Sequence, residues 1–229
     1  MTRSLANSDI PRLMRARHST SAKHDKIVNI ETMGSNPLGW VRQVPEEERK
    51  NVFAVVIYIP KPLGTFLDNL RRELVPAYNP HAHVSVLPPR PLSVDWRIAS
   101  AQAVELIDAR AAFDVELTTV GIFPKTDVVY IEVGKGASEL EMLHTAMNTG
   151  SFEFAEPFSY RPHITLAQEV APECVSAVHD LACRRWREFQ GSRTFRAERA
   201  VFVQNTVGDC WIDLAEYSLG NSVPSHAKF

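Results

Sequence analysis

Two tetrapeptides in this chain repeat one pattern, in which a histidine, an apolar residue, a hydroxyl residue and a second apolar residue follow one another. They are His83-Val84-Ser85-Val86 and His163-Ile164-Thr165-Leu166. Because side chains alternate along a β-strand, each histidine shares a face with the hydroxyl two residues later, and the apolar residues face the other side. Each tetrapeptide therefore predicts a strand with one face for a core and one face that carries an imidazole and a hydroxyl.

The segments that precede the two motifs also correspond. A strand, a helix and a motif strand are predicted over residues 51–88, and the same order is predicted over residues 128–168. The motif histidines are 80 residues apart (163 minus 83). A supersecondary unit that recurs in this way indicates two similar halves. We expect the halves to face each other and to bring the motif strands together across a central cleft.

The remaining elements decide between a parallel and an antiparallel architecture. Strands are predicted at 51–60, 81–89, 113–123, 128–134, 160–169, 195–205 and 209–219, and helices at 65–74, 94–110, 137–148 and 173–188. Alternating strands and helices alone would favour a parallel α/β sheet. Turn sequences at 124–127 and 205–208 instead predict two hairpins, which require antiparallel pairing. We therefore predict an α+β fold with mostly antiparallel sheets.

Composition restricts the class of protein and the partners it can have. The 229 residues are 45% hydrophobic and 23% charged, with a formal net charge of -2, as in an ordinary soluble globular protein without bulk attraction to nucleic acid. No apolar run is long enough to span a membrane, so no membrane partner is expected. Cys174, Cys183 and Cys210 lack metal or redox spacing, which fits free thiols in the cytoplasm. Nothing in the sequence argues against a monomer.

The chain divides into three parts by composition. Residues 1–48 are polar and lack sustained periodicity, and through Pro45 they carry seven Lys or Arg against three acidic residues. We interpret them as a flexible N-terminal extension. A basic arm that binds RNA is the alternative for this segment. Residues 49–220 are expected to form one bilobal domain, and residues 221–229 a C-terminal tail.

The two motifs, with their surroundings HVSVLPPRPL and RPHITLAQ, resemble the 2H phosphoesterase superfamily and in particular its bacterial 2'-5' RNA ligase-like branch. The resemblance extends over about residues 51–219. A single motif of this kind arises easily by chance, whereas two copies on strands that follow matching elements are specific. Ser85 stands where threonine is commoner in the family; serine keeps the hydroxyl donor and lacks only a methyl group.

The resemblance implies a bilobal, pseudo-symmetric fold with helices packed outside the sheets, and phosphodiester chemistry without a metal or other cofactor. Its implied partners are RNA ends or nucleotides that carry a 2',3'-cyclic phosphate. Hydrolysis of such a diester is the expected activity, with reversible 2'-5' RNA ligation as a second expectation. Carried over to this sequence, His83 and His163 are the catalytic pair, and Ser85 and Thr165 hold the phosphate oxygens.

Two histidines suit this chemistry because hydrolysis of a phosphodiester needs a base for water and an acid for the leaving oxygen. Imidazole can serve in either role near neutral pH. We assign His163 as the base and His83 as the acid for hydrolysis, with exchanged roles in the ligation direction. Hydroxyl groups beside them can donate to the non-bridging oxygens, where negative charge accumulates.

Alternation along the strands predicts two further substrate contacts. Arg161 has the parity of His163 and Thr165, and His81 has the parity of His83 and Ser85. Because Pro80 and Pro162 make the strand geometry there uncertain, solvated positions at the strand ends are an equally good interpretation. A metal site built on His81, His83 and His163 is disfavoured, since no carboxylate has matching spacing and the hydroxyls suit phosphate better.

Several alternatives remain open at the level of sequence. The same fold can act on a non-RNA cyclic phosphate or nucleotide, or serve as an RNA-binding module without catalysis. Two complete motifs favour an enzyme, because a decayed site would be expected to have lost one of them. Core packing is the better interpretation for each of four aromatic residues that could instead stack on a base, namely Tyr58, Phe123, Tyr130 and Phe202.

Overall fold

The computed structural model describes residues 44–75 and 81–220, so the predictions for residues 1–43 and 221–229 lie outside the described residues. The strands are β1 (Arg49–Tyr58), β2 (His83–Arg90), β3 (Phe113–Ile122), β4 (Val129–Val133), β5 (His163–Ala167), β6 (Thr194–Ala197), β7 (Arg199–Thr206) and β8 (Trp211–Ser218). The helices are α1 (Leu63–Leu74), α2 (Trp96–Asp108), α3 (Ala137–Met147) and α4 (Val175–Glu188), and short 3₁₀ turns span Glu46–Glu48, Gly150–Phe152 and Pro172–Cys174.

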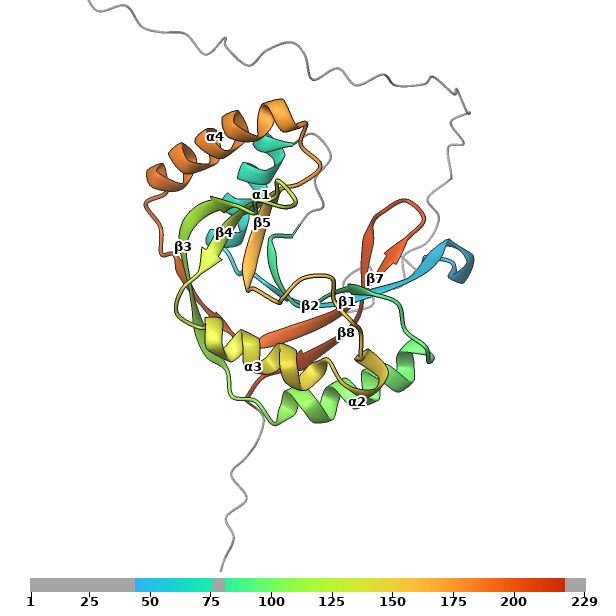
Figure 1. Cartoon of the computed structure of the whole chain (residues 1–229). Coiled ribbons are helices and arrows are strands. Elements are labelled where there is room, and N and C mark those ends of the chain that lie inside the picture. The colour runs from blue at the N-terminus through green and yellow to red at the C-terminus, as the bar shows by residue number, and fades with distance from the viewer. Residues whose placement is uncertain (1–43, 76–80, 221–229) are drawn as a thin grey trace, which may run out of the picture. The chain divides into compact units, whose positions relative to one another are not determined.

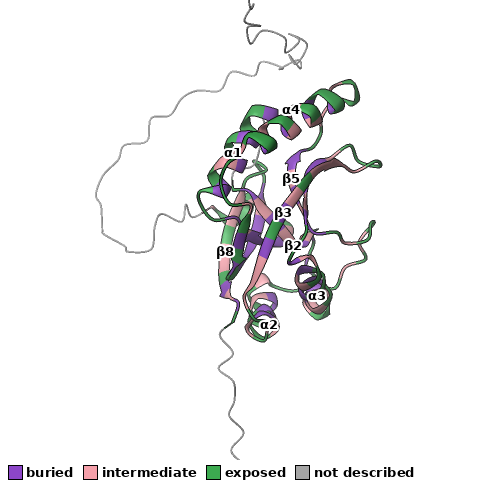
Figure 2. Cartoon of the chain, turned by 90° about the vertical axis from the view of Figure 1, so that its left-hand side faces the viewer, coloured by how far each residue is buried: buried purple, intermediate pink, exposed green. Residues whose placement is uncertain are grey.

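The strands form two four-stranded sheets, in the orders β2-β1-β7-β8 and β5-β4-β3-β6, and every neighbouring pair is antiparallel. Helices α2 and α3 pack beside the first sheet, and α1 and α4 pack beside the second (Figure 1). These helices turn their buried residues inward and their exposed residues outward (Figure 2). The predicted α+β fold with two similar lobes is confirmed. No helix in the described residues is long and apolar enough to cross a membrane.

The helices that connect paired strands are exchanged between the two halves. Helix α1 follows β1 in the first sheet but contacts β5 in the second, whereas α3 follows β4 in the second sheet but contacts β2 in the first. Both helices bury residues at the spacing i, i+3, i+4 and i+7, which forms one helical face. The matching sets are Leu67, Leu70, Arg71 and Leu74 in α1 and Leu140, Leu143, His144 and Met147 in α3. Each half therefore covers the motif strand of the other.

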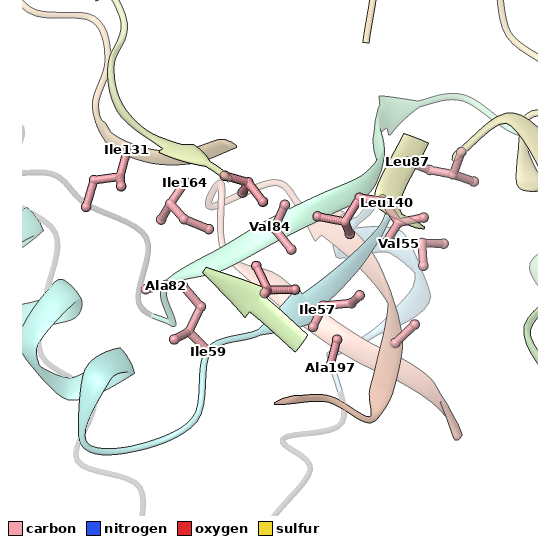
Figure 3. Packing of buried hydrophobic residues seen from close by; sticks show 14 of the residues in the cluster. Val55, Ile57, Ile59, Ala82, Val84, Leu87, Ile131, Leu140, Ile164 and Ala197 are labelled. Carbon is pink, nitrogen blue, oxygen red and sulfur yellow. The ribbon is translucent and has the colours of Figure 1, made fainter. Parts of the chain in front are cut away.

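The core between the sheets takes the apolar residues of both motifs. Val84 and Ile164 are fully buried, and each pairs with a buried isoleucine on the neighbouring strand, Ile57 or Ile131. These side chains meet in one apolar cluster (Figure 3). Burying each such side chain contributes about 1.5–3 kcal/mol to folding. The predicted alternation therefore fixes which face of each motif strand is covered.

Two of the differences between the predicted strands and the structure have a reason in the sheets themselves. The single strand expected over 195–205 is wrong, because the chain leaves the second sheet after Ala197 and enters the first at Arg199. Strand β2 does not end at Pro88 and Pro89 but continues to Arg90. The two prolines are tolerated there because β2 is an edge strand and its register with β1 shifts between Leu87 and Arg90, so neither proline has a partner residue in β1.

Candidate active site

The structure brings the two motif strands into contact. Strands β2 and β5 lie next to each other although their sequences are 80 residues apart. The histidine and the hydroxyl residue of each motif are half-buried and lie on the face opposite the core; they are His83, Ser85, His163 and Thr165. The alternation predicted from the sequence is therefore present in both strands, and it places these four polar side chains outside the apolar cluster.

Both motif strands carry a β-bulge at the same point. The register passes from Val56 opposite Ser85 to Val55 opposite Leu87, and from Tyr130 opposite Thr165 to Val129 opposite Ala167. One extra residue, Val86 or Leu166, thus follows each hydroxyl residue. A bulge bends the strand and re-aims nearby side chains, and bulges are common beside active sites. The similarity of the halves extends to this irregularity.

The two imidazoles are oriented by the same local hydrogen bond. Nδ1 of His83 lies 2.8 Å from the carbonyl oxygen of His81, and Nδ1 of His163 lies 2.7 Å from that of Arg161. Because a carbonyl oxygen only accepts, each Nδ1 carries the hydrogen and donates it. The neutral imidazoles are therefore held in the tautomer in which Nε2 has the lone pair, so Nε2 is the nitrogen available for proton transfer.

Burial lowers the pKa of both histidines. For His83 the loss of solvation lowers the pKa to about 4, and the positive charges of Arg71 and of protonated His163 act in the same direction. The bond to the His81 carbonyl opposes this shift only in part. The pKa of His163 is also lowered, by burial and then by the charge of Arg161. Burial therefore favours the neutral form of both imidazoles when no anion is bound.

Helix α1 fixes the approach of the chain to His83. The carboxylate of Asp68 accepts a hydrogen bond of 2.7 Å from the backbone N–H of Ala82, and its Oδ1 lies 3.8 Å from Nη1 of the buried Arg71. The carbonyl oxygen of Ala82 in turn accepts a bond of 3.0 Å from Ile59 N–H. The residue before the first motif is thus held from both sides.

An aromatic ring that is fixed by a hydrogen bond lies beside His83. The ring of Tyr58 meets those of His83 and His81 edge-on, with centroid distances of 6.4 and 5.5 Å. The hydroxyl of Tyr58 donates to Oδ1 of Asp213 at 2.7 Å, and burial raises the pKa of this phenol far above its ordinary value. Tyr58 therefore stays neutral and is fixed to β8.

The surroundings of His163 contain an aromatic pair and a guanidinium. Phe123 and Tyr130 stack with centroids 3.9 Å apart, and His163 meets Phe123 edge-on at 4.8 Å. The Arg161 guanidinium lies 5.8 and 5.4 Å from the two ring centroids and forms an ion pair with Glu132. Gly121 gives the Tyr130 ring its place, since a Cβ there would lie 3.0 Å from that ring.

The two substrate contacts expected from strand parity lie outside the strands. Strands β2 and β5 begin at His83 and His163, so the unbroken strands predicted from 81 and 160 are shorter than expected. His81 is exposed and has φ of 68°, and its carbonyl rather than its ring contacts His83. Arg161 does lie beside the second motif, through its position over the aromatic pair. Within the described residues, no three His, Cys, Asp or Glu side chains form a group that could hold a metal.

Sequence reasoning did not identify several neighbours of the motif histidines. Glu132 lies opposite His163 in the β4–β5 register, and Asp213 reaches Tyr58 from a strand 155 residues away. Neither carboxylate belongs to a motif. The only signal for Glu132 was its place two residues after Tyr130 in a predicted strand, and that signal becomes informative only once the pairing of β4 with β5 is known.

Comparison with known proteins agrees with the fold and the motifs. The model of the 2'-5' RNA ligase superfamily matches residues 59–209. Among solved structures, E. coli LigT complexed with NADP+ has a TM-score of 0.53 at 14% identity and covers 76% of this chain and 98% of its own. A protein described as a phosphoesterase has a TM-score of 0.52 at 12% identity, covering 75% and 98%. No curated protein sequence matches the chain. Because the family match spans most of the chain and includes both motifs, the protein belongs to the 2'-5' RNA ligase superfamily of 2H phosphoesterases.

Proposed function

We propose that this protein is a metal-independent phosphodiesterase that hydrolyses RNA-type 2',3'-cyclic phosphodiesters by two-histidine general acid/base catalysis. The observation that carries the proposal is the matched orientation of the imidazoles. In both halves Nδ1 is bound to the carbonyl two residues earlier, which leaves Nε2 of His83 and of His163 for proton transfer. Two such nitrogens on adjacent strands suit an in-line displacement at phosphorus.

In this mechanism one histidine activates water and the other protonates the leaving group. Nε2 of His83 takes a proton as the water oxygen bonds to phosphorus. His163, which the bound phosphate favours in its protonated form, gives its Nε2 proton to the ribose oxygen as the bond of that oxygen to phosphorus breaks. The products are a phosphomonoester and a free ribose hydroxyl. We assign His83 as the base because its pKa is lowered to about 4. This reverses the assignment made from the sequence, and the roles exchange in the ligation direction.

The hydroxyls and one guanidinium complete the proposed site. Ser85 and Thr165 share the strand faces of the two histidines, so they can donate to the non-bridging phosphate oxygens. Arg161 is half-exposed beside His163, where its charge can neutralise the phosphate. His81 is exposed and adjoins the ring of Tyr58, and we keep it as a second substrate contact.

Nucleotide ligands of a structural neighbour support a ribose phosphate as the ligand. E. coli LigT has been solved complexed with NADP+ and with 3'-AMP. Both molecules carry a phosphate on a ribose 2' or 3' oxygen, which are the oxygens joined in a 2',3'-cyclic phosphate. We propose the same ligand chemistry for this chain, with an RNA terminus as the substrate and 2'-5' ligation as the reverse activity.

The cysteines and the origin of the motif strands bear on the location and assembly of the protein. All three cysteines are free, which fits the reducing cytoplasm. We propose that the protein acts there as a monomer, since the motif strands of both halves come from one chain. Sedimentation of the purified protein with and without an RNA oligonucleotide tests this assembly state.

Turnover of a 2',3'-cyclic nucleotide by histidine variants tests the proposed function. His83→Ala and His163→Ala should each lower kcat by about 10²–10⁴-fold, the usual contribution of one general acid or base. His179→Ala is the control, because His179 lies in α4 and contacts Cys183 instead of either motif. Unchanged kcat in both motif variants would contradict the proposal.

Two further conditions in the same assay separate the alternatives. A chelator should leave turnover unchanged, whereas a metal hydrolase would lose it. Faster turnover of an oligonucleotide than of a mononucleotide 2',3'-cyclic phosphate would support an RNA terminus as the substrate. Binding of RNA without any turnover would instead support a non-catalytic module.

A further inference from the structure

The outer edge of β2 is held by side chains instead of a neighbouring strand. Strand β2 is an edge strand of its sheet, so only β1 pairs with it. Three of its carbonyl oxygens accept side-chain hydrogen bonds: the Tyr160 hydroxyl donates to Ser85 at 2.8 Å, Nδ1 of His144 to Val86 at 2.8 Å, and Nε of Arg90 to Pro88 at 3.0 Å. The first two carbonyls belong to the bulge, where ladder bonds are disrupted.

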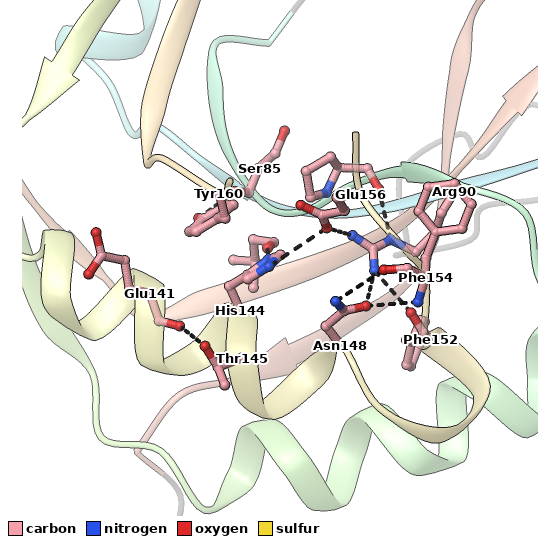
Figure 4. Close-up of polar contacts among 12 residues, drawn as sticks. Ser85, Arg90, Glu141, His144, Thr145, Asn148, Phe152, Phe154, Glu156 and Tyr160 are labelled. Atoms are coloured by element: carbon pink, nitrogen blue, oxygen red, sulfur yellow. Dashed lines mark hydrogen bonds and ion pairs between the residues drawn. The ribbon is translucent and has the colours of Figure 1, made fainter. Parts of the chain in front are cut away.

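These three donors are joined to one another in a buried network. The His144 ring stacks parallel on that of Tyr160 with centroids 3.9 Å apart, and its Nε2 lies 3.7 Å from Oε1 of Glu156. Glu156 also pairs with Arg90, whose Nη1 donates to Asn148 Oδ1 at 2.7 Å (Figure 4). Arg90 is 2% exposed and His144 8%. Bonds of this kind, shielded from water, hold their members in fixed positions.

The sequence position of Tyr160 gives this network a role in the site. Tyr160 lies three residues before His163, and its hydroxyl reaches the backbone of Ser85, 75 residues away in the chain. One side chain therefore ties the segment that enters the second motif to the hydroxyl residue of the first. Among the residues that the structure describes, no side chain donates to the carbonyl oxygens of Thr165 or Leu166, the equivalent positions in the other half.

We propose that Tyr160 is a positioning residue for the phosphodiesterase reaction, with His144 supporting its ring. Its hydroxyl fixes the Ser85 peptide and the bulge relative to His163, so that the phosphate-binding hydroxyl of one half keeps its spacing from the imidazole of the other. This inference rests on the proposed function for its catalytic consequence. The rate should be sensitive to this spacing, because a displacement of about 1 Å can cost up to about 10²-fold and a smaller one proportionately less.

Tyr160→Phe removes the hydroxyl and keeps the ring that stacks on His144. Tyr217→Phe is the control, since the Tyr217 hydroxyl also makes one hydrogen bond, of 2.8 Å, to Ser100 away from the motifs. Tyr217 is buried and Tyr160 is half-buried. Both variants should lower the stability to unfolding by similar amounts, because each loses one hydrogen bond. Only Tyr160→Phe should lower kcat, by about tenfold, with a smaller change in KM.

The outcomes separate a positioning role from a structural one. A fall in kcat specific to Tyr160→Phe supports the proposal, and kcat values that match in the two variants overturn it. Amide hydrogen exchange over residues 83–87 adds a readout that needs no substrate, and exchange there should be faster in Tyr160→Phe than in the wild type or Tyr217→Phe. Unchanged exchange would contradict the proposal that the Tyr160 hydroxyl fixes the Ser85 peptide. Absence of turnover in the wild-type protein would contradict the proposed function instead.

Discussion

The two halves of the site have the same backbone arrangement but differ in the side chains that surround it. Each has a histidine bonded through Nδ1 to the carbonyl two residues earlier, a hydroxyl residue two positions later and a bulge directly after it. Around His83 the polar side chains are hydrogen-bonded to other parts of the fold: Tyr58 is bound to the exposed Asp213, and the Tyr160 network holds the outer edge of β2. Around His163 a half-exposed guanidinium lies over an aromatic pair.

The difference is clearest in two arginine–glutamate pairs. Side-chain exposure is 1% for Arg90 and 12% for Glu156, against 50% for Arg161 and 39% for Glu132. A buried pair cannot lose one partner without leaving an uncompensated charge, whereas an exposed pair can exchange its partner for solvent or another anion. The ion pair of the first half is thus structural. In the second half, Arg161 can exchange Glu132 for another anion.

The largest expected effect concerns stability and tests this contrast. Arg90→Met should lower the free energy of unfolding by about 3–5 kcal/mol, because Glu156 stays buried without its partner. Arg161→Met should change it by no more than about 1 kcal/mol, since that pair is half-exposed. Denaturant unfolding measures both values. If Arg90→Met is too unstable to purify, the double variant with Glu156→Gln should recover part of the loss. Equal losses in the two single variants would remove the contrast.

A smaller effect tests whether the halves are equivalent in chemistry. Ser85→Ala and Thr165→Val each remove one hydroxyl on the face of a motif histidine, and each should lower kcat/KM for a 2',3'-cyclic nucleotide by about 10²-fold. Ser192→Ala, which removes an exposed hydroxyl bonded to the Thr194 carbonyl, should have no effect. If one motif variant keeps wild-type kcat/KM, the phosphate contacts only one half.

The strands and their buried faces were predictable because alternation is a local property. His83-Val84-Ser85-Val86 and its second copy need only strand conformation for the apolar residues to share a face, and the structure has them so. The change of sheet between Ala197 and Arg199 was not predictable. It depends on which strands are open for pairing on each side of Glu198, and that is a property of the assembled sheets.

The contact between the two motif strands was predictable from the sequence, but the residues that surround the motif histidines were not. Glu132, Asp213 and Tyr160 act across strand registers or contacts between segments distant in the chain, and none of them stands at a motif spacing. Strand parity predicted that Arg161 lies beside His163. The structure has it there, although Arg161 is not part of the strand. The residue precedes β5, and its guanidinium is held over Phe123 and Tyr130.

The central claim is that imidazoles from both halves act on one phosphate, and a titration of the two side chains by ¹H–¹⁵N NMR tests it most directly. In the free protein both pKa values should lie below 6.5, with that of His83 near 4, since burial favours the neutral rings. Saturating inorganic phosphate should raise both pKa values, because an adjacent anion favours the protonated form. A phosphate that shifts the pKa of only one histidine, or of neither, would contradict the claim.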